Sequence, residues 1–133
     1  MPSTYAHYIF GQQIRRQLTG YERKVVDKYQ ELFNIGLHGP DILFYYKPLR
    51  RNKVNRLGNK IHDESGRKFF VHAAKVLHTH DQYEEYLAYV YGVICHFALD
   101  ETCHGYVEQA VKEIGLAHIA VEGELDRELM IMN

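Results

Sequence analysis

The sequence holds few of the residues that cross-link or interrupt a chain. It has two cysteines and three prolines among 133 residues. Cys95 and Cys103 lie in a stretch that we expect to be helical, about 12 Å apart along its axis, which is beyond the reach of a disulfide. Both are therefore predicted to be free thiols, as is usual in a reducing compartment.

Two kinds of apolar segment are also missing. The N-terminus shows no basic segment followed by an apolar one, so the sequence predicts no secretory signal. No uninterrupted apolar run reaches the ~18 residues of a transmembrane helix. We therefore expect one domain, residues 1–133, without a transmembrane segment and located in the cytoplasm.

Strand patterns are missing as well. No run alternates apolar and polar residues over the length of a half-buried strand, and hairpin turn signals are rare. We therefore predict an all-α fold, a compact helical bundle. Apolar spacing predicts helices at 5–18, 21–34, 65–78, 82–104 (capped by Asp81, then broken or bent at Gly105 before continuing to 114) and 116–130. Residues 36–64 are predicted to be the irregular part, apart from a short helix starting at Asp41.

The charge of the chain excludes one general class of function. The formal net charge is −1, so the chain as a whole has no pull toward nucleic acid or a membrane surface, and no stable nucleic-acid complex is expected. The basic segment 47–60 is read as a solvated loop, with attraction of an anion as the alternative.

Histidine is plentiful, with nine in the chain. His96, Asp100 and His104 are spaced four and four apart in the apolar stretch 85–104, so a helix would project them from one face. Imidazole and carboxylate groups are costly to bury without partners, and both are zinc ligands. One such histidine would be read as an ordinary core residue, but this set, joined by His118 and Glu122 at the same spacing, predicts a multinuclear metal site. Four other histidines are weaker candidates: His38, His72, His78 and His80.

Several segments together resemble the bacterial zinc-dependent phospholipase C family. They are residues 1–11, the turn Gly39-Pro40-Asp41, the segment around His62, residues 91–100 and the pair His118 and Glu122. The resemblance implies an all-α fold around two or three zinc ions (Zn2+), and a phosphodiester or phospholipid substrate. It assigns Asp41, His62, His96 and Asp100 to one ion, with Asp100 bridging to a second that takes His7. It assigns His104, His118 and Glu122 to a third ion, and makes Asp41 the catalytic base.

The predicted reaction is hydrolysis of a phosphodiester by metal-activated water, because clustered metal ions lower the pKa of bound water and clamp the reacting oxygens. Two alternatives stay open: a single-strand nuclease, which needs aromatic platforms for bases, and a metal-binding helical protein without turnover. Relatives continue past the last ligand, so the domain is expected to be shortened at its C-terminal end. The apolar stripe Leu125, Leu129 and Met132 then predicts a homodimer.

Overall fold

The computed structural model describes residues 4–115 and 118–132, without the side chains of 114, 118 and 119. Every regular element in these ranges is a helix, so the prediction of an all-α fold is confirmed. The elements are α1 (Thr4–Gln17), α2 (Gly20–Lys28), α3 (Gln30–Gly36), the 3₁₀ helix η1 (Gly39–Tyr45), α4 (Lys53–Asp63), α5 (Gly66–Leu77), α6 (Tyr83–Ile114) and α7 (His118–Met132).

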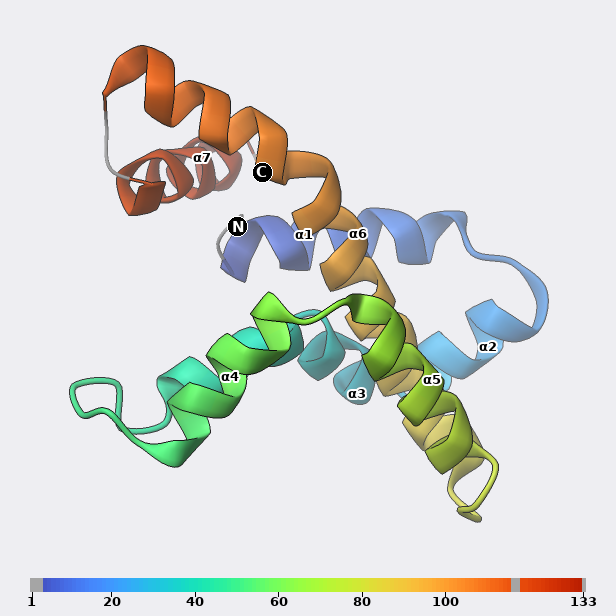
Figure 1. The fold of residues 1–133 in the computed structure, drawn as a ribbon. Coiled ribbons are helices and arrows are strands. Elements are labelled where there is room, and N and C mark those ends of the chain that lie inside the picture. The colour runs from blue at the N-terminus through green and yellow to red at the C-terminus, as the bar shows by residue number, and fades with distance from the viewer. Residues whose placement is uncertain (1–3, 116–117, 133) are drawn as a thin grey trace.

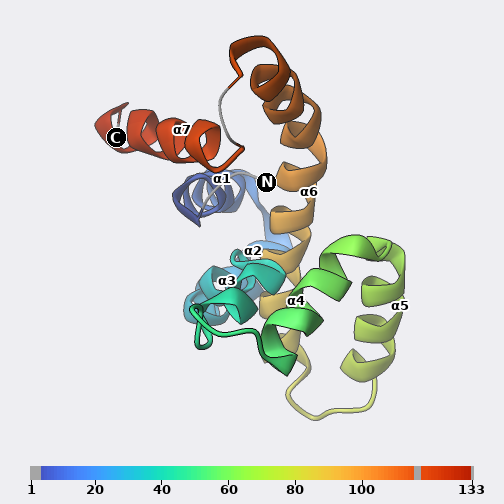
Figure 2. The same cartoon turned by 60° about the vertical axis from the view of Figure 1, so that its left-hand side comes forward.

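Helix α6 is the axis of the molecule. It contacts α1, α2, α3, η1, α5 and α7, and Figures 1 and 2 show the shorter helices arranged along its length. Its composition explains its length: it contains no proline, begins with Glu84 and Glu85 and ends with Lys112, which suits the helix dipole. Gly115 stops it at a φ of 70°, where glycine is favoured.

One predicted boundary of α6 is wrong, and of the two outcomes expected at Gly105, a break or a bend, the break does not occur. Gln82, and not Asp81, is the residue before the first helical turn, and no side chain caps that end. Gly105 does not break the helix, because glycine costs only about 1 kcal/mol in a helix whose other residues favour it. The C-terminal half of α6 instead leans away from the direction of its N-terminal half (Figure 1).

The predicted helix at 21–34 is two helices that meet at Tyr29. The backbone there leaves helical geometry, with φ −118° and ψ 46°. Val25 of α2 belongs to a core cluster with Leu77 and Leu87, whereas Phe33 of α3 belongs to another with Cys95. Val26 of α2 also joins the cluster of Phe33, and Leu32 of α3 packs against that of Val25. The break at Tyr29 therefore leaves both helices in contact with both clusters, and tertiary packing overrides the helical periodicity of the sequence.

The prediction that 36–64 is largely irregular is wrong for most of its length. Asp41 lies at the start of η1, as expected, but α4 follows, and the residues of this range without regular helix are 37–38, 46–52 and 64. Asn52 caps α4, with its side-chain oxygen accepting from the Asn55 backbone N–H at 2.9 Å. Two features of the sequence indicate this helix: the cap at Asn52 and the helical spacing of Val54, Leu57 and Ile61. The many basic residues of the segment favoured a loop instead.

The closest packing in the core is between α3 and α6. A Cβ atom on Gly36 would overlap the backbone carbonyl of Tyr89, and one on Gly92 would overlap the carbonyl of Phe33. The two helices therefore meet backbone to backbone, which only glycine allows. This contact fixes the residues directly after α3, including Leu37 and Asp41, against the middle of α6.

The remaining expectations concern thiols, membrane spans and the last helix. Cys95 and Cys103 are both free, as predicted. No helix in the described ranges is long and apolar enough to cross a membrane. In α7, Leu125 and Met132 stay exposed, and α7 packs on α1 and α6. The homodimer remains a prediction.

Replacing Gly92 by alanine tests the role of the α3–α6 contact. The new methyl group would overlap a backbone atom that cannot move aside, so we expect Gly92→Ala to lower the free energy of unfolding by about 3 kcal/mol, measured by urea denaturation. Gly105→Ala is the matched control in the same helix. Its Cβ would meet nothing within 4 Å, so that change should stabilise the protein by about 1 kcal/mol. Equal effects of the two substitutions would refute the packing argument.

Candidate metal centre

Helix α6 supplies two neighbouring polar groups from one face, as the spacing predicts. His96 is 1% exposed, and its Nδ1 lies 2.9 Å from the carbonyl oxygen of Leu37. A carbonyl can only accept, so Nδ1 carries the proton and Nε2 presents its lone pair. That lone pair faces Asp100, whose Oδ2 lies 3.1 Å away.

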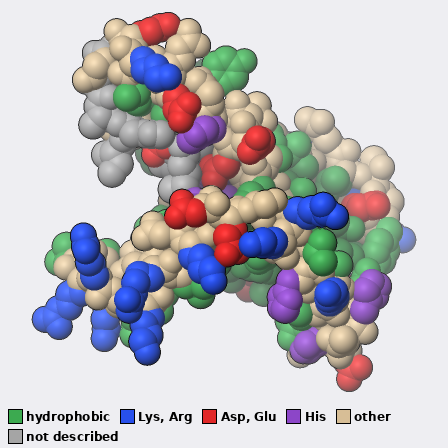
Figure 3. Space-filling model, in the orientation of Figure 1, with side chains coloured by type: hydrophobic (Ala, Val, Ile, Leu, Met, Phe, Trp, Pro, Cys, Tyr) green, Lys and Arg blue, Asp and Glu red, His purple; other side chains and the backbone are tan. Residues whose placement is uncertain are grey.

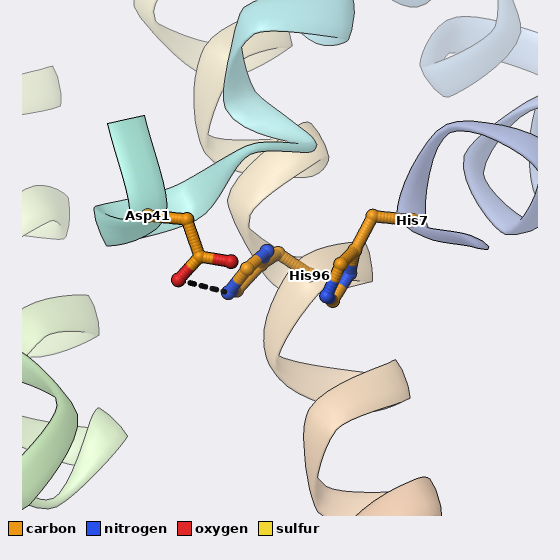
Figure 4. A group of neighbouring side chains, drawn as sticks. All are labelled: His7, Asp41 and His96. Carbon is orange, nitrogen blue, oxygen red and sulfur yellow. Dashed lines mark ion pairs between the residues drawn. The ribbon is translucent and has the colours of Figure 1, made fainter. Parts of the chain in front are cut away.

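The 3₁₀ helix η1 brings Asp41 to the other side of His96. The Asp41 carboxylate is buried, and its Oδ1 lies 3.9 Å from His96 Nε2 (Figure 4). Gly39 makes this approach possible, because its φ is 51° and a Cβ there would overlap the His96 ring. The turn Gly39-Pro40 thus places Asp41 against the imidazole.

His62 reaches the same carboxylate from α4. Its Nε2 lies 2.8 Å from Asp41 Oδ1, and its Nδ1 lies 2.8 Å from the carbonyl oxygen of Gly58. Both neighbours are acceptors, so this arrangement suits the protonated imidazolium. The hydrogen bond to Asp41 raises the pKa of His62, although partial burial acts in the opposite direction.

His7 comes from α1 and closes the group on its far side. The side chain is 2% exposed, and its ring stacks on that of His96 with centroids 4.0 Å apart and planes 16° from parallel (Figure 4). Its Nε2 lies 3.1 Å from Asp100 Oδ1. Asp100 therefore offers one oxygen to His7 and the other to His96.

The N-terminus of α1 is held in place from α7. The two carboxylate oxygens of Asp126 accept from the backbone N–H groups of Tyr5 and Ala6 at 3.1 and 3.0 Å. These are donors that the helix itself leaves unpaired, and a carboxylate at this end also suits the helix dipole. Asp126 thus positions the helical turn that carries His7.

Several polar atoms of this group are buried without a hydrogen bond in the described structure: both ring nitrogens of His7, Nε2 of His96 and Oδ1 of Asp100. Burial alone would raise the pKa of Asp100, but its contacts with His7 and His96 hold that pKa well below the usual range. The group therefore brings together a carboxylate and imidazole nitrogens that could share a cation.

A zinc ion fits this donor set. Zinc ligands are neutral imidazole nitrogens and carboxylate oxygens at about 2.0–2.2 Å, so two ligand atoms on a tetrahedral ion lie roughly 3.3 Å apart. The nitrogen–oxygen separations of 3.1 Å at Asp100 are close to this value. Two groups have ligand atoms that all lie within 4.8 Å of one another, namely His7, Asp41 and His96, and His62, His96 and Asp100.

Neither of these two groups includes His104 or Glu122, two of the remaining predicted ligands. His104 is 60% exposed, and its Nε2 lies 3.0 Å from Glu108 of the same helix. Glu122 is buried on α7, where burial raises its pKa to about 7 and the charges of Asp100 and Asp41 act in the same direction. The side chain of His118 lies outside the described part of the structure. A third metal position therefore remains a prediction.

A cavity of about 560 Å³ opens beside the centre. His62, His96, Asp100 and His104 line it, together with the acidic side chains Asp63, Glu64 and Glu101. Three groups that support the site were not identified from the sequence: the Leu37 carbonyl, the Gly58 carbonyl and Asp126. The two carbonyls carry no side-chain signal, but Asp126 continues the four-residue spacing of His118 and Glu122.

A family model described as zinc dependent phospholipase C matches residues 6–132, which is nearly the whole chain. The predicted resemblance is thus confirmed. No curated protein and no solved structure is significantly similar to the chain.

Zinc should stabilise the folded chain. Zinc added to chelator-treated protein is expected to raise Tm, because the five donor residues come together only in the folded chain. At a free zinc concentration of about 100 times Kd, the free energy of unfolding should rise by about 2.7 kcal/mol. Asp100→Asn should weaken this response, whereas Asp81→Asn, an exposed aspartate away from the centre, should leave it unchanged. A melting curve of the unsubstituted protein that does not move with zinc would contradict the site.

Zinc binding should also depend on pH. A zinc ligand must lose its proton, and the contact with Asp41 keeps His62 protonated to a higher pH than an ordinary histidine. Zinc affinity should therefore fall, about tenfold per pH unit for each proton displaced, as pH drops below the raised pKa of His62. Calorimetric titrations with zinc at several pH values check this. An affinity independent of pH from 5 to 8, roughly the range in which histidine titrates, would exclude His62 as a ligand.

Proposed function

The chain belongs to the zinc-dependent phospholipase C family, a family of phosphodiesterases, and we propose that it hydrolyses a phospholipid phosphodiester in the cavity beside Asp41. The observation that carries the proposal is the arrangement at Asp100. Its two oxygens lie 3.1 Å from imidazole nitrogens of two different histidines, next to a cavity large enough for a phosphate and its substituents.

We assign the ligands as follows. Asp41, His62, His96 and Oδ2 of Asp100 would hold one zinc ion. His7 and Oδ1 of Asp100 would contribute to a second. His96 can serve one ion only, because its Nδ1 is bonded to the Leu37 carbonyl. We also propose a third ion, held by His104, His118 and Glu122, and only the sequence pattern supports it.

Such ions supply a water molecule of lowered pKa and positive charge beside the phosphate. The protein's own contribution is proton transfer and orientation. Asp41 would accept a proton from the attacking water, and the turn Gly39-Pro40 holds its carboxylate beside His96. The water oxygen becomes bonded to phosphorus, the bond from phosphorus to the alcohol oxygen breaks, and that oxygen takes up a proton. The products are a phosphomonoester and an alcohol.

The cavity lining favours a lipid headgroup over a nucleobase. Among the described residues that line it, Phe97 is the one aromatic side chain, whereas His62, Ser65 and Glu101 are polar. Recognition of single-stranded nucleic acid relies on successive aromatic platforms for stacked bases. The acidic residues at the cavity would also repel a polyanionic strand.

Asp41→Asn tests the role of the base. The amide keeps the size and one oxygen that can bind metal, but it cannot accept the proton. We expect kcat to fall by ~10²–10⁴ with zinc content largely retained, measured on a soluble aryl phosphodiester and by elemental analysis. Asp63→Asn, an exposed neighbour at the same cavity, is the control and should keep its rate. Parallel loss of zinc and activity in Asp41→Asn would mean that Asp41 is a ligand only.

Substrate class is tested by comparing three substrates at saturating zinc: phosphatidylcholine in mixed micelles, an aryl phosphodiester and a single-stranded oligonucleotide. We expect turnover of the first two. Cleavage of the oligonucleotide alone would replace the proposal by the nuclease alternative. If the zinc-loaded protein turns over none of the three substrates, the result would favour the alternative of a metal-binding protein without catalysis.

A further inference from the structure

Positive charge is concentrated in one part of this nearly neutral chain. Residues 42–62 contain six of its 16 lysines and arginines and none of its 17 aspartates and glutamates. The six are Lys47, Arg50, Arg51, Lys53, Arg56 and Lys60. They lie on the loop 46–52 and on α4, where Figure 3 shows a cluster of basic side chains at the lower left. We call residues 45–60 the basic lobe.

The loop of the basic lobe has a fixed conformation. The side-chain amide of Asn52 donates to the carbonyls of Tyr46 and Arg50 at 3.1 and 3.0 Å. The amide of Asn55 donates to the carbonyl of Leu43 at 3.0 Å. These bonds hold a turn that presents Leu49 at its tip, where 98% of the side chain is exposed.

The apolar surface of the lobe is unusual for an exposed loop. Leu49 follows Pro48, and Tyr45 and Tyr46 are also at least half exposed. Lys47 lies over the Tyr46 ring, with its Nζ 5.4 Å from the ring centroid. Exposed apolar and aromatic side chains rimmed by cations are the composition of segments that lie in a lipid interface.

The charges of the lobe are available to a partner. Arg50, Arg51, Lys53 and Arg56 form no ion pair with any other described residue of the chain, whereas Arg15, Arg23 and Arg127 elsewhere do. On α4, Lys53, Arg56 and Lys60 are spaced three and four apart and so share one face. Lys60 lies 3.9 Å from Glu64, but the cations of Lys53, Arg56 and the adjoining loop remain to complement a negatively charged plane.

We propose that the basic lobe docks the protein on an anionic lipid surface, with Leu49 entering the interface and the surrounding arginines and lysines contacting the headgroups. A nucleic acid would satisfy the charges but would give Leu49 no apolar environment. The lobe joins η1 to α4, and therefore connects the segments that carry Asp41 and His62. Docking does not require hydrolysis, and it can be measured on protein without zinc.

Cosedimentation with vesicles measures the charge component. The full chain should pellet with vesicles of phosphatidylcholine and phosphatidylserine, and not with phosphatidylcholine alone. Neutralising Arg50, Arg51 and Lys53 to glutamine should weaken binding about a hundredfold, since each such residue contributes roughly fivefold near an anionic surface. The control variant changes Arg16, Lys24 and Lys75, three exposed residues outside the lobe, to glutamine. The two triple variants therefore have the same net charge. Equal losses in the two triple variants would overturn the proposal, as would no binding by the unsubstituted chain.

Leu49→Trp measures insertion directly, because the chain has no tryptophan of its own. Its fluorescence should shift to the blue with anionic vesicles, whereas Tyr21→Trp, exposed on α2, should not respond. Leu49→Ser should weaken vesicle binding about tenfold, in line with the free energy of burying a leucine side chain. Tighter binding to an oligonucleotide than to vesicles, unaffected by Leu49→Ser, would overturn the proposal in favour of a nucleic-acid partner. All substituted positions are exposed, so thermal melting should confirm that each variant folds.

Discussion

The contact between Gly36 and Gly92 is the constraint on which the site depends. Because these glycines let α3 and α6 approach to backbone distance, the carbonyl of Leu37, the residue that follows α3, lies within hydrogen-bond distance of the His96 ring. The carbonyl of Leu37 then fixes the imidazole tautomer, and the next turn, at Gly39, brings Asp41 toward the other ring nitrogen. A side chain at either glycine would separate the helices, and the carbonyl, the tautomer and the carboxylate would lose their alignment together.

The candidate metal centre places several polar side chains close together in the protein interior. Asp100 lies between two buried imidazoles, and Asp41 lies 3.9 Å from the lone pair of His96, so acceptor atoms face one another across short distances. Such an arrangement is unfavourable in a protein interior unless a cation is shared. The fold therefore holds these groups in place through backbone bonds from Leu37 and Gly58, which do not depend on the cation.

Much of the site could be predicted from the sequence, because its signals are local. The four-residue spacing puts His96 and Asp100 on one helix face, and Gly39-Pro40 marks a turn before Asp41. The choice of His62 over His72 came only from the family resemblance; in the structure His72 is exposed on α5. The break at Tyr29, the Leu37 carbonyl and the cap from Asp126 could not be predicted, because each is decided by contacts between segments distant in sequence. Helix α4 was missed because its charges resemble those of a loop.

The order of the elements along the chain has a consequence for biosynthesis. Helices α2, α3 and α4 have nine, seven and eleven residues, lengths at which an isolated helix is marginal in water. Helix α6 supports α2 and α3 directly and α4 through η1, and it leaves the ribosome after all of them. Three of the five clustered donors, His7, Asp41 and His62, are therefore synthesised before the helix that brings them together. Binding of a metal by the whole group would thus be a late event for the nascent chain, because it requires α6.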